Sequence, residues 1–523
     1  MNRDLRLCLD LRWGKRMKKY LLGLDVGTSS LKTAIIDEDG HVVSKSARGY
    51  EPMSLHPGWQ EISAESIWAA VIWNLKKMLL EGPVDPERIA GIGISCLCPG
   101  LVALGAEGEV LHDPIIYSDR RSAEEADAIK RSVGEEHLFF ITANRCMSGA
   151  MSGTSMLWIR NHCPEIYEKT RYFGHINTML GVRLTGNFAM DRSNASYTSM
   201  FETRGSLEWS RDLAQKIGID FDKLPPLMNS DEVLGGLVNQ EFIAMGIPAG
   251  TPVVIGGGDT ACASLAAGIV SNGDVCESVG TTNVLTICVD QPNFSPSNIN
   301  RCHVVRGKWI YQGAMSHAGG SLRWFRDEFC QDLVKAGGEL DEDAFDLMTK
   351  AASLSRAGAN GVVFLPYMMG ERSPVWDSDA RGVFFGMSLN TNRRDLIRAI
   401  LEATGYGTRQ LKEIAEDLTG LRIRRFSSLG GGARSRVWSQ IKANIIGVDI
   451  DVLDVSDMAP VGAALLAGVG IGLYKDAVDA ASHVERKVYR KVVCDHSDDA
   501  VYAKRYQAYK QLYPRLKDLY QYC

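Results

Sequence analysis

The sequence predicts an α/β protein of two domains, each a mixed sheet with flanking helices, arranged around a cleft. Three observations support this class. Strands alternate with helices along the chain, one hairpin motif occurs twice, and 523 residues exceed the roughly 250 to 300 that a single hydrophobic core usually supports. The composition, 45% hydrophobic and 23% charged, is typical of a soluble globular protein.

The first elements follow from local hydrophobic patterns. Residues 20–25 are predicted to form an apolar strand, the letters GTSS a turn, and residues 31–37 a second strand, which together make a β-hairpin. Apolar residues at helical spacing predict a helix over 64–80, and residues 89–95 form a further strand. The tail from about residue 498 is predicted to be a long amphipathic helix that packs on the rest of the protein.

The hairpin recurs in the second half of the chain. Residues 25–37 (DVGTSSLKTAIID) align without gaps with residues 278–290 (SVGTTNVLTICVD), and both read as strand, Gly-Thr turn and strand. The offset along the chain between these two segments is close to half its length, which favours duplication over chance similarity of two short hairpins. We therefore expect an N-terminal domain over 18–258 and a C-terminal domain over 259–523, with the glycines 256–258 as a hinge.

Charge and hydropathy argue against nucleic acid and membranes as binding partners. Lys plus Arg number 58 and Asp plus Glu 63, so the net charge of -5 offers no broad basic surface for nucleic acid. The longest uncharged apolar stretch, residues 458–474, is shorter than the roughly 20 residues of a membrane span and is expected to be a packed helix. The N-terminus lacks the apolar region of a signal peptide, and the twelve cysteines include no C-x-x-C. We expect a cytoplasmic protein without a membrane partner, preceded by an extension over 1–17.

The turn of the first hairpin carries the residue types that bind a phosphate. Gly27 lets backbone N–H groups approach, Thr28 and Ser29 offer hydroxyl groups, and Lys32 offers a positive charge. The chain holds no Walker A motif, and an ordinary hairpin turn would explain either loop by itself. Two matching loops, one in each half, favour a nucleotide clamp; the second loop contains Gly280, Thr281 and Thr282.

Two further glycine clusters each end a strand and open a helix. Asp259 follows the first cluster, where it could cap a helix that begins at Thr260 or act as a general base beside a substrate. The second cluster, within residues 427–440, could hold an anion or let a planar base approach, or simply form a tight turn. The absence of H-E-x-x-H and G-x-S-x-G removes support for metalloprotease and hydrolase functions.

These segments, in this order, resemble the FGGY family of carbohydrate kinases, a branch of the actin, hexokinase and Hsp70 superfold, from about residue 19 to the C-terminal helix. The most specific segments are residues 380–403 (ARGVFFGMSLNTNRRDLIRAILEA) and the preceding LPYMMGERSPVWD. Residues 117–122 and 184–196 look like the family's sugar-side segments. The resemblance implies two duplicated actin-like (ribonuclease H-like) domains, and transfer of the ATP γ-phosphoryl group, with Mg²⁺, to a sugar or polyol hydroxyl.

The resemblance also implies a role for each site residue. Asp259 would be the catalytic base, and Asp25 would lie near the metal. ATP would contact Gly27, Thr28, Ser29, Lys32, Gly280, Thr281, Thr282, Gly319, Gly431, Gly432, Ala433 and Ser435. The acceptor would contact Cys98, Pro99, Asp119, Arg121 and Asp259.

The resemblance is strongest to the xylulokinase branch, which implies a small, pentulose-like ketose as the acceptor. Cys98 and Pro99 stand where that branch carries Met-His, so the sequence does not name the sugar. Two alternatives stay open. One is a kinase of glycerol or of another C4 to C6 polyol, and the other is a nucleotide-driven binding or scaffold ATPase of the same superfold. A homodimer is also left open.

Overall fold

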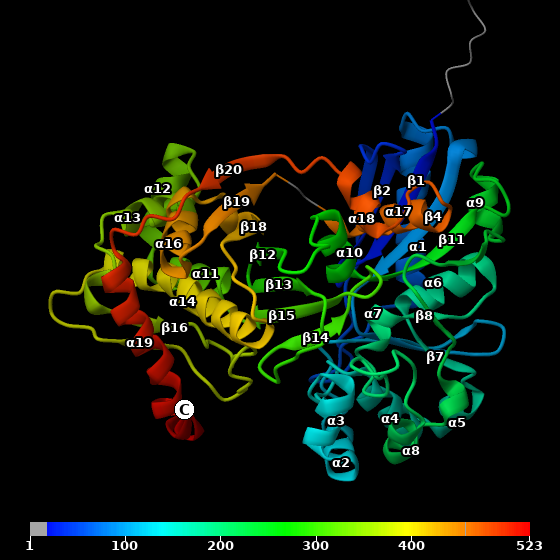
Figure 1. The fold of residues 1–523 in the computed structure, drawn as a ribbon, viewed down its shortest axis with the longest axis horizontal. Helices are drawn as coiled ribbons and strands as arrows, with labels where there is room; N and C mark the ends of the chain where they lie inside the picture. Colours follow the sequence, from blue (N-terminus) through cyan, green and yellow to red (C-terminus); the bar gives the residue numbers. More distant parts are fainter. Residues whose placement is uncertain (1–17, 455–456) are drawn as a thin grey trace, which may run out of the picture.

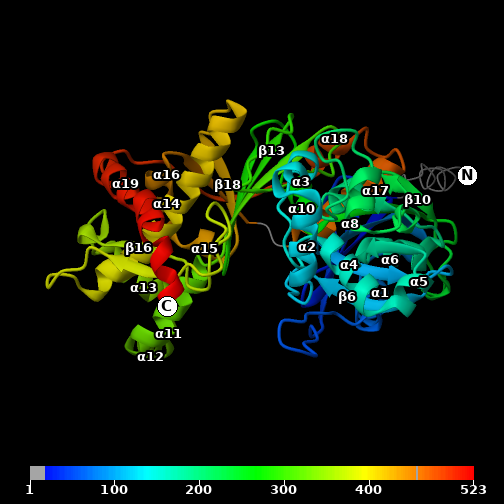
Figure 2. The same ribbon diagram turned by 90° about the horizontal axis from the view of Figure 1, so that it is seen from below.

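The structure, a computed structural model, describes residues 18–454 and 457–523 and consists of two lobes (Figure 1). The predicted extension over 1–17 lies outside the described residues. Each lobe is built on one mixed β-sheet with helices on its faces, and Figure 2 shows the two lobes side by side from below. The predicted α/β class with two mixed sheets is therefore confirmed.

The first lobe contains a six-stranded sheet in the order β10-β11-β4-β1-β2-β3. β1 pairs antiparallel with β2 and parallel with β4, and β11 adds parallel to the other edge of β4. β1 and β4 are almost wholly buried, as expected for strands that are covered on both faces. The strands are β1 (Tyr20–Val26), β2 (Ser30–Asp37), β3 (Val42–Gly49), β4 (Ile89–Cys96), β10 (Val233–Gly236) and β11 (Pro252–Gly258).

The second lobe contains a seven-stranded sheet in the order β14-β15-β13-β12-β18-β19-β20. Its largest helix, α14 (Arg393–Thr419), begins at a capping box formed by Asn392 and Asp395 and is capped at its end by Gly420 in the left-handed conformation. The strands are β12 (Val275–Val279), β13 (Asn283–Val289), β14 (Ile299–Cys302), β15 (Trp309–Met315), β18 (Arg425–Leu429), β19 (Asp449–Leu453) and β20 (Val488–Val492).

The duplication predicted from thirteen residues extends through both sheets. β1–β2 and β12–β13 are antiparallel hairpins. In each sheet the first hairpin strand pairs parallel with a later strand, β4 or β18, and the second pairs antiparallel with a third strand, β3 or β15. The two turns differ in length, because Val26 pairs with Leu31 whereas Val279 pairs with Asn283.

Helices and small sheets complete each lobe. In the first lobe a three-stranded sheet, β6-β5-β7, packs against α4, α5 and α6. The helices of this lobe are α1 (Ala64–Glu81), α2 (Ala123–Val133), α3 (Glu135–Thr142), α4 (Ser152–His162), α5 (Pro164–Lys169), α6 (Ile176–Thr185), α7 (Arg192–Ala195), α8 (Arg211–Ile217) and α9 (Gln240–Ala244). Its small strands are β5 (Gly100–Leu104), β6 (Val110–Ile116), β7 (Tyr172–His175), β8 (Met190–Asp191) and β9 (Leu227–Met228).

The C-terminal tail forms the predicted amphipathic helix, α19, in the second lobe. Tyr502, Tyr506 and Tyr509 are buried on its inner face. The other helices of this lobe are α11 (Gly319–Phe329), α12 (Gln331–Leu340), α13 (Ala344–Ser353), α14 (Arg393–Thr419), α15 (Gly431–Arg434) and α16 (Arg436–Ile446), with α19 spanning Asp499–Leu516. A two-stranded sheet joins β16 (Val363–Leu365) to β17 (Val383–Phe385).

Two helices from the last part of the chain pack on the first lobe. α17 (Met458–Gly470) and α18 (Ala477–His483), orange in Figure 1, lie beside the blue strands of the first sheet. A Cβ atom on Gly23 would stand 1.8 Å from the Pro460 carbonyl oxygen, so only glycine permits this approach. α17 also packs on α10 (Asp259–Ala266), where Gly462 lies against Cys262. The packed helix predicted for residues 458–474 is therefore present.

None of the helices in the described ranges has both the length and the apolar character that a membrane crossing needs.

The glycines predicted to form a hinge lie inside a strand instead. Gly257 and Gly258 pair with β4 at Ser95 and Cys96. Gly256 has a φ of 67°, and a Cβ atom there would stand 1.7 Å from the Ile94 carbonyl oxygen. These glycines allow β11 to pack closely on its neighbours, so the hinge prediction for residues 256–258 is wrong.

Candidate active site

Three polar side chains meet at the carboxyl ends of the central strands of the first sheet. Asp25 near the end of β1 pairs in register with Ser95 of β4, and Ser95 pairs in turn with Gly257 of β11. Asp259 follows β11 directly. The carboxyl edge of an open parallel sheet is where α/β proteins place their ligands. Asp25 and Asp259 therefore flank one end of β4.

The two carboxyl groups influence each other. Burial and the nearby charge of Asp259 together raise the pKa of Asp25 to about 7, against a hydrogen bond from Ser95 Oγ (2.8 Å) and the charge of Lys32. Burial also raises the pKa of Asp259, against the charge of Arg301 and hydrogen bonds from Thr260. Two acidic groups in this relation favour a bound cation.

The local geometry of Asp259 differs from that of a helix cap. The N-cap of α10 is Gly258, and Asp259 is the first helical residue. Its Oδ1 accepts hydrogen bonds from the backbone N–H (2.6 Å) and hydroxyl (3.1 Å) of Thr260, whereas a capping carboxylate accepts from residues two or three positions later. These bonds fix Oδ1 and orient the carboxyl group.

The first predicted phosphate loop is held in a defined shape. The Tyr50 hydroxyl donates to the Gly27 carbonyl, and the Gly27 N–H donates to Ser30 across the turn (2.9 Å). Thr28 Oγ1 lies 3.4 Å from the Tyr117 hydroxyl, and Lys32 Nζ pairs with Asp457 Oδ1 at 3.0 Å. Gly27, Thr28 and Lys32 are partly exposed and Ser29 is exposed, so this loop is accessible to a ligand.

The second predicted loop and Gly319 are in direct contact. The Gly319 N–H donates to the Gly280 carbonyl (3.0 Å), and the N–H of Gly320 donates to Thr281 (3.0 Å). A Cβ atom on Gly319 would stand 2.5 Å from the Gly280 oxygen. The turn residues Gly280 and Thr281 are exposed, and Thr282 is partly so. The N-terminus of α11 therefore docks on this loop.

The predicted ATP contacts within residues 431–435 lie beside the end of β12. A Cβ atom on Gly432 would stand 2.5 Å from a Val279 side-chain carbon, directly before the second phosphate loop. Gly431 is exposed with open space around it, whereas Ala433 is buried. Ser435 caps α16 through its hydroxyl, which accepts from the Trp438 N–H (3.4 Å). The second sheet thus gathers the second phosphate loop, Gly319 and the residues 431–435.

Positively charged side chains from both lobes lie near the loops. Burial lowers the pKa of Arg372, and the charge of Arg120 lowers it further, while Tyr117 acts in the opposite direction. Burial lowers the pKa of His317, next to Gly320, and the charge of Arg372 adds to this. Arg372 is thus within electrostatic reach of Tyr117, the partner of Thr28, and of His317 beside the second loop.

The predicted acceptor contacts Asp119 and Arg121 are occupied by protein partners. Arg121 Nη2 contacts Asp119 Oδ2 (2.8 Å) and Glu61 Oε1 (2.6 Å), and both side chains of the Asp119–Arg121 pair are fully buried. The guanidinium also stacks on Trp59, at 3.9 Å from the ring centroid. These contacts favour a structural role for Asp119 and Arg121, which hold residues 117–122 in place. Arg120 stays exposed beside Tyr117.

The other predicted acceptor contacts, Cys98 and Pro99, lie just after β4 and face a polar neighbourhood. Cys98 Sγ is 4.0 Å from His175 Nδ1, and the His175 ring also bonds to Ser152 Oγ (2.9 Å). Burial raises the pKa of the Cys98 thiol, and the charge of Arg301 opposes this. Pro99 is buried.

Sequence reasoning missed several residues of this region, chiefly Arg301 and Tyr197. Arg301 belongs to β14 of the second sheet but lies against Gly258 of the first, and its Nη1 is 3.4 Å from the Tyr197 hydroxyl. A charged residue inside an otherwise uncharged strand was the available signal. This signal names no partner, because the residues that Arg301 contacts lie in the other lobe.

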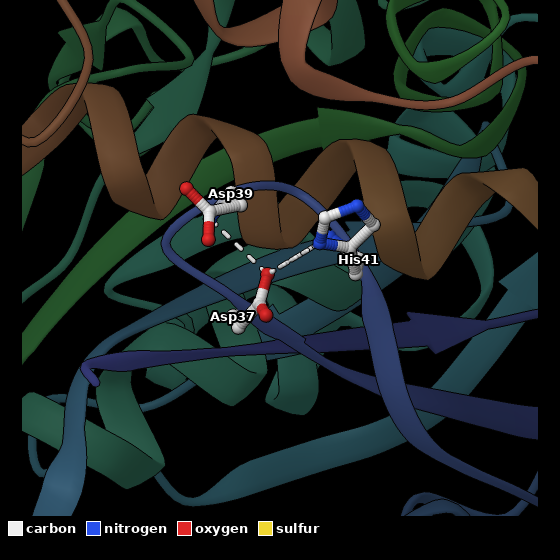
Figure 3. A group of neighbouring side chains, drawn as sticks. All are labelled: Asp37, Asp39 and His41. Atoms are coloured by element: carbon white, nitrogen blue, oxygen red, sulfur yellow. Dashed lines mark hydrogen bonds and ion pairs between the residues drawn. The ribbon is translucent and has the colours of Figure 1, made fainter.

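One acidic cluster lies elsewhere and serves a turn. Asp37, Asp39 and His41 meet at the connection between β2 and β3 (Figure 3). Asp37 accepts from the backbone N–H of Asp39 (3.1 Å) and of His41 (3.0 Å), and Lys18 Nζ contacts it at 2.8 Å. These bonds account for the cluster as a turn stabilised by an ion pair.

Comparison with known proteins places this geometry in context. The profile of the FGGY family of carbohydrate kinases, N-terminal domain, matches residues 20–266, and that of the C-terminal domain matches residues 276–471. The chain is 29% identical to the xylulose kinase of Bacillus subtilis over 96% of this chain and 98% of that protein. It is also 29% identical to the gluconokinase of the same species, with 96% of each chain covered. A solved xylulose kinase from Rhodospirillum rubrum superimposes with a TM-score of 0.88 at 27% identity, covering 96% of this chain and 100% of that one.

Proposed function

The chain belongs to the FGGY family of carbohydrate kinases, and from this premise we propose that its acceptor is a small ketose of the pentulose type. The protein is an ATP-dependent sugar kinase of the actin-like fold. The likeness to xylulose kinase, which extends over nearly the whole of both chains, supports the ketose assignment. The use of ATP supports a cytoplasmic location.

One observation carries the assignment of the catalytic residue. Asp259 is within electrostatic reach of Asp25, which lies in the strand before the first phosphate loop, and of Arg301, which contacts Tyr197. Thr260 fixes Oδ1, so Oδ2 is the oxygen that would accept the proton of the acceptor hydroxyl. The positive charge of Arg301 favours the carboxylate form that a general base needs.

The reaction follows from this placement. The acceptor oxygen forms a bond to the γ-phosphorus, the bond from that phosphorus to the β–γ bridging oxygen breaks, and ADP leaves. The hydroxyl proton passes to Asp259. The N–H groups of the turn residues that follow Gly27 and Gly280, which are exposed or partly exposed, would bind phosphate oxygens, and the residues 431–435 would contact adenosine.

The residues present also fit a magnesium ion. Among the described residues, the buried carboxyl group of Asp25 has a single side-chain hydrogen bond, from Ser95. The negative charge of Asp259 disfavours ionisation of Asp25. Carboxylate oxygens are the ligands that Mg²⁺ prefers, often through water. Asp25 would hold the ion, which when bound with ATP neutralises charge on the phosphate oxygens.

The test is a coupled ADP-release assay with purified protein and a panel of ketoses and polyols. We expect sugar-dependent ADP release with at least one ketose, and its loss in Asp259→Asn. ADP release that no sugar stimulates would instead support a scaffold ATPase of the same superfold. A polyol as the best acceptor would replace the ketose assignment and leave the kinase activity intact.

A further inference from the structure

Among the described residues, Arg301 is a buried positive charge that makes no ion pair or hydrogen bond with a carboxylate, although the charge of Asp259 acts on it over a longer distance. Its side chain is 2% exposed, yet it forms no ion pair with any residue in the described ranges. Nε and Nη2 lack a hydrogen-bond partner in the same part of the chain, and Nη1 makes one long contact, 3.4 Å, to Tyr197. An unpaired buried guanidinium costs several kcal/mol of folding free energy, so such groups are normally paired.

The position of Arg301 is built by both lobes. β14, an edge strand of the second sheet, lies against α7 of the first lobe, where the Cys302 N–H donates to Ser196 Oγ (3.1 Å). Asn300 and Asn144 exchange hydrogen bonds of 2.7 and 3.0 Å across the same junction. The backbone on both sides of Arg301 is therefore fixed, and its guanidinium is delivered to the first lobe in a defined place.

The unbonded N–H groups lie beside Gly258, in the region of Tyr197 and Cys98, where the acceptor is proposed to bind. A Cβ atom on Gly258, the residue before Asp259, would stand 2.6 Å from Arg301 Nη2. The guanidinium also lies 5.3 Å from the ring centroid of Tyr197, and its charge acts on Cys98. Lys32 and Thr28, which belong to the first phosphate loop, lie beside Asp457 and Tyr117 instead. The acceptor, rather than ATP, is therefore the molecule that meets Arg301.

From this geometry we propose that Arg301 binds a carboxylate of the acceptor, so that the preferred acceptor is a sugar acid of the ketose type. This inference rests on the proposed kinase function and specifies its substrate class. Arg presents parallel N–H groups that match a carboxylate in two hydrogen bonds, and Nε with Nη2 is such a pair. The phosphorylated hydroxyl would lie at Asp259, with the carboxylate at the other end of the short chain.

Matched acceptors test the proposal on the unmodified protein. D-arabino-hex-2-ulosonate differs from D-fructose in carrying a carboxylate at C1 in place of the CH₂OH group next to the ketone. D-threo-pent-2-ulosonate differs from D-xylulose in the same way. We expect kcat/KM for the acid to exceed that for its neutral partner by about 100-fold or more, because a site built for a polar group rejects the analogue that lacks it. D-fructose 1-phosphate is included to distinguish a phosphate from a carboxylate.

Substitution of Arg301 links the preference to this residue. In Arg301→Met the acid-to-neutral ratio of kcat/KM should fall by about 100-fold, and in Arg301→Lys by less, since lysine keeps the charge but not the planar pair of donors. Arg306→Met is the matched control, because Arg306 is largely exposed and pairs with Asp231. It should leave the ratio unchanged. Calorimetry of the acids with Asp259→Asn, without ATP, measures binding apart from turnover.

The outcomes separate this inference from the proposed function. A preference for the neutral ketoses, or an unchanged ratio in a folded Arg301→Met protein, would overturn the carboxylate assignment while the kinase function stands. A preference for D-fructose 1-phosphate would overturn it in favour of a phosphate. Failure of every sugar and acid to stimulate ADP release, in a protein that still binds ATP, would overturn the proposed function itself.

Discussion

Asp25 and Asp259 occupy the ends of two strands that flank β4, and the charge of each disfavours the charge of the other. Burial, reinforced by Asp259, raises the pKa of Asp25 to about 7. Lys32 and Ser95 act on Asp25 in the opposite direction, and Arg301 does so on Asp259. The pair thus fits the two roles proposed for it, binding of a cation at Asp25 and proton acceptance at Asp259.

The first prediction concerns the catalytic base. Asp259→Asn should lower kcat by about 10² to 10⁴ while ATP binding survives, because the amide cannot accept the proton of the acceptor. Steady-state kinetics and calorimetry with ATP measure the two effects. Asp290→Asn, directly after β13 in the second lobe, is the control and should keep normal turnover. Near-normal turnover in Asp259→Asn would leave Asp259 with a structural role.

The second prediction concerns the phosphate loops. Gly27→Val and Gly280→Val should each weaken ATP binding by tenfold or more, with little effect on sugar binding, because a side chain would stand where backbone N–H groups must approach phosphate. Gly280→Val is the sharper test, since the nearest atom to a Cβ there is 4.0 Å away, against 3.1 Å at Gly27. Gly338→Val, in open space on α12, is the control. Unchanged ATP affinity in either loop variant would remove that loop from the site.

The third prediction concerns the sugar. Cys98 and Pro99 replace the polar pair expected for xylulose, so D-xylulose should not give the highest kcat/KM in a broad panel of ketoses, polyols and sugar acids. The measurement is the ratio of kcat/KM values under identical conditions. If D-xylulose ranks first, the contribution of this turn to specificity has been misjudged.

The fourth prediction concerns the dependence of stability on pH. Burial raises the pKa of Glu371 to about 7, although the carboxyl accepts from the N–H groups of Ser316 (2.6 Å) and Arg372 (2.7 Å). Between the ordinary pKa of glutamate and this value the folded protein keeps a proton that the unfolded chain releases. This group's contribution to the free energy of unfolding should therefore fall as pH rises from about 5 to 7, by on the order of 3 kcal/mol, and level off above.

Glu371→Gln removes that titration. Its free energy of unfolding, measured in urea at several pH values, should decline less between pH 5 and 8 than that of the parent protein. Glu328→Gln, at an exposed site on α11, is the control and should follow the parent curve. Parallel curves for Glu371→Gln and the parent would show that Glu371 ionises normally in the folded state.

The fifth prediction concerns lobe closure. ATP hydrolysis without sugar should be slow, and the radius of gyration should be smaller with both ligands bound than with neither, because closure excludes water from the γ-phosphate. Since residues 256–258 lie in a strand, the bend is expected in the connections at 267–274 and 484–487, which join the first lobe to β12 and β20. Scattering and an ADP assay test this. An unchanged radius together with fast, sugar-independent hydrolysis would contradict it.

Several features were predictable because they depend on local sequence. The two Gly-Thr hairpins, the helix predicted over 64–80, the packed helix α17 and the amphipathic C-terminal helix follow from hydrophobic periodicity and turn residues. The order of the segments was sufficient to indicate the family. The catalytic role of Asp259 stays a prediction, based on the unusual place of a carboxyl group directly after a buried strand and three glycines.

Side-chain direction and the contacts between lobes were decided by the tertiary structure. Asp119 and Arg121 turn inward to form a buried ion pair, whereas Tyr117 and Arg120 of the same segment stay exposed, a division that no spacing rule indicated. Residues 256–258 are glycines because Ile94 and Arg301 approach them closely, not because the chain bends there.

The sequence by itself determined the repeated hairpins and the kinase family, and it singled out Asp259 as the candidate base, because each depends on a short run of neighbouring residues. Only the tertiary structure decided that α17 covers the first sheet and that β14 delivers Arg301 beside Gly258, in the other lobe. Strand register and the packing of one lobe on another depend on residues far apart in the chain, and no local pattern specifies them. The residue proposed here to select the acceptor therefore became visible only when both lobes were in place.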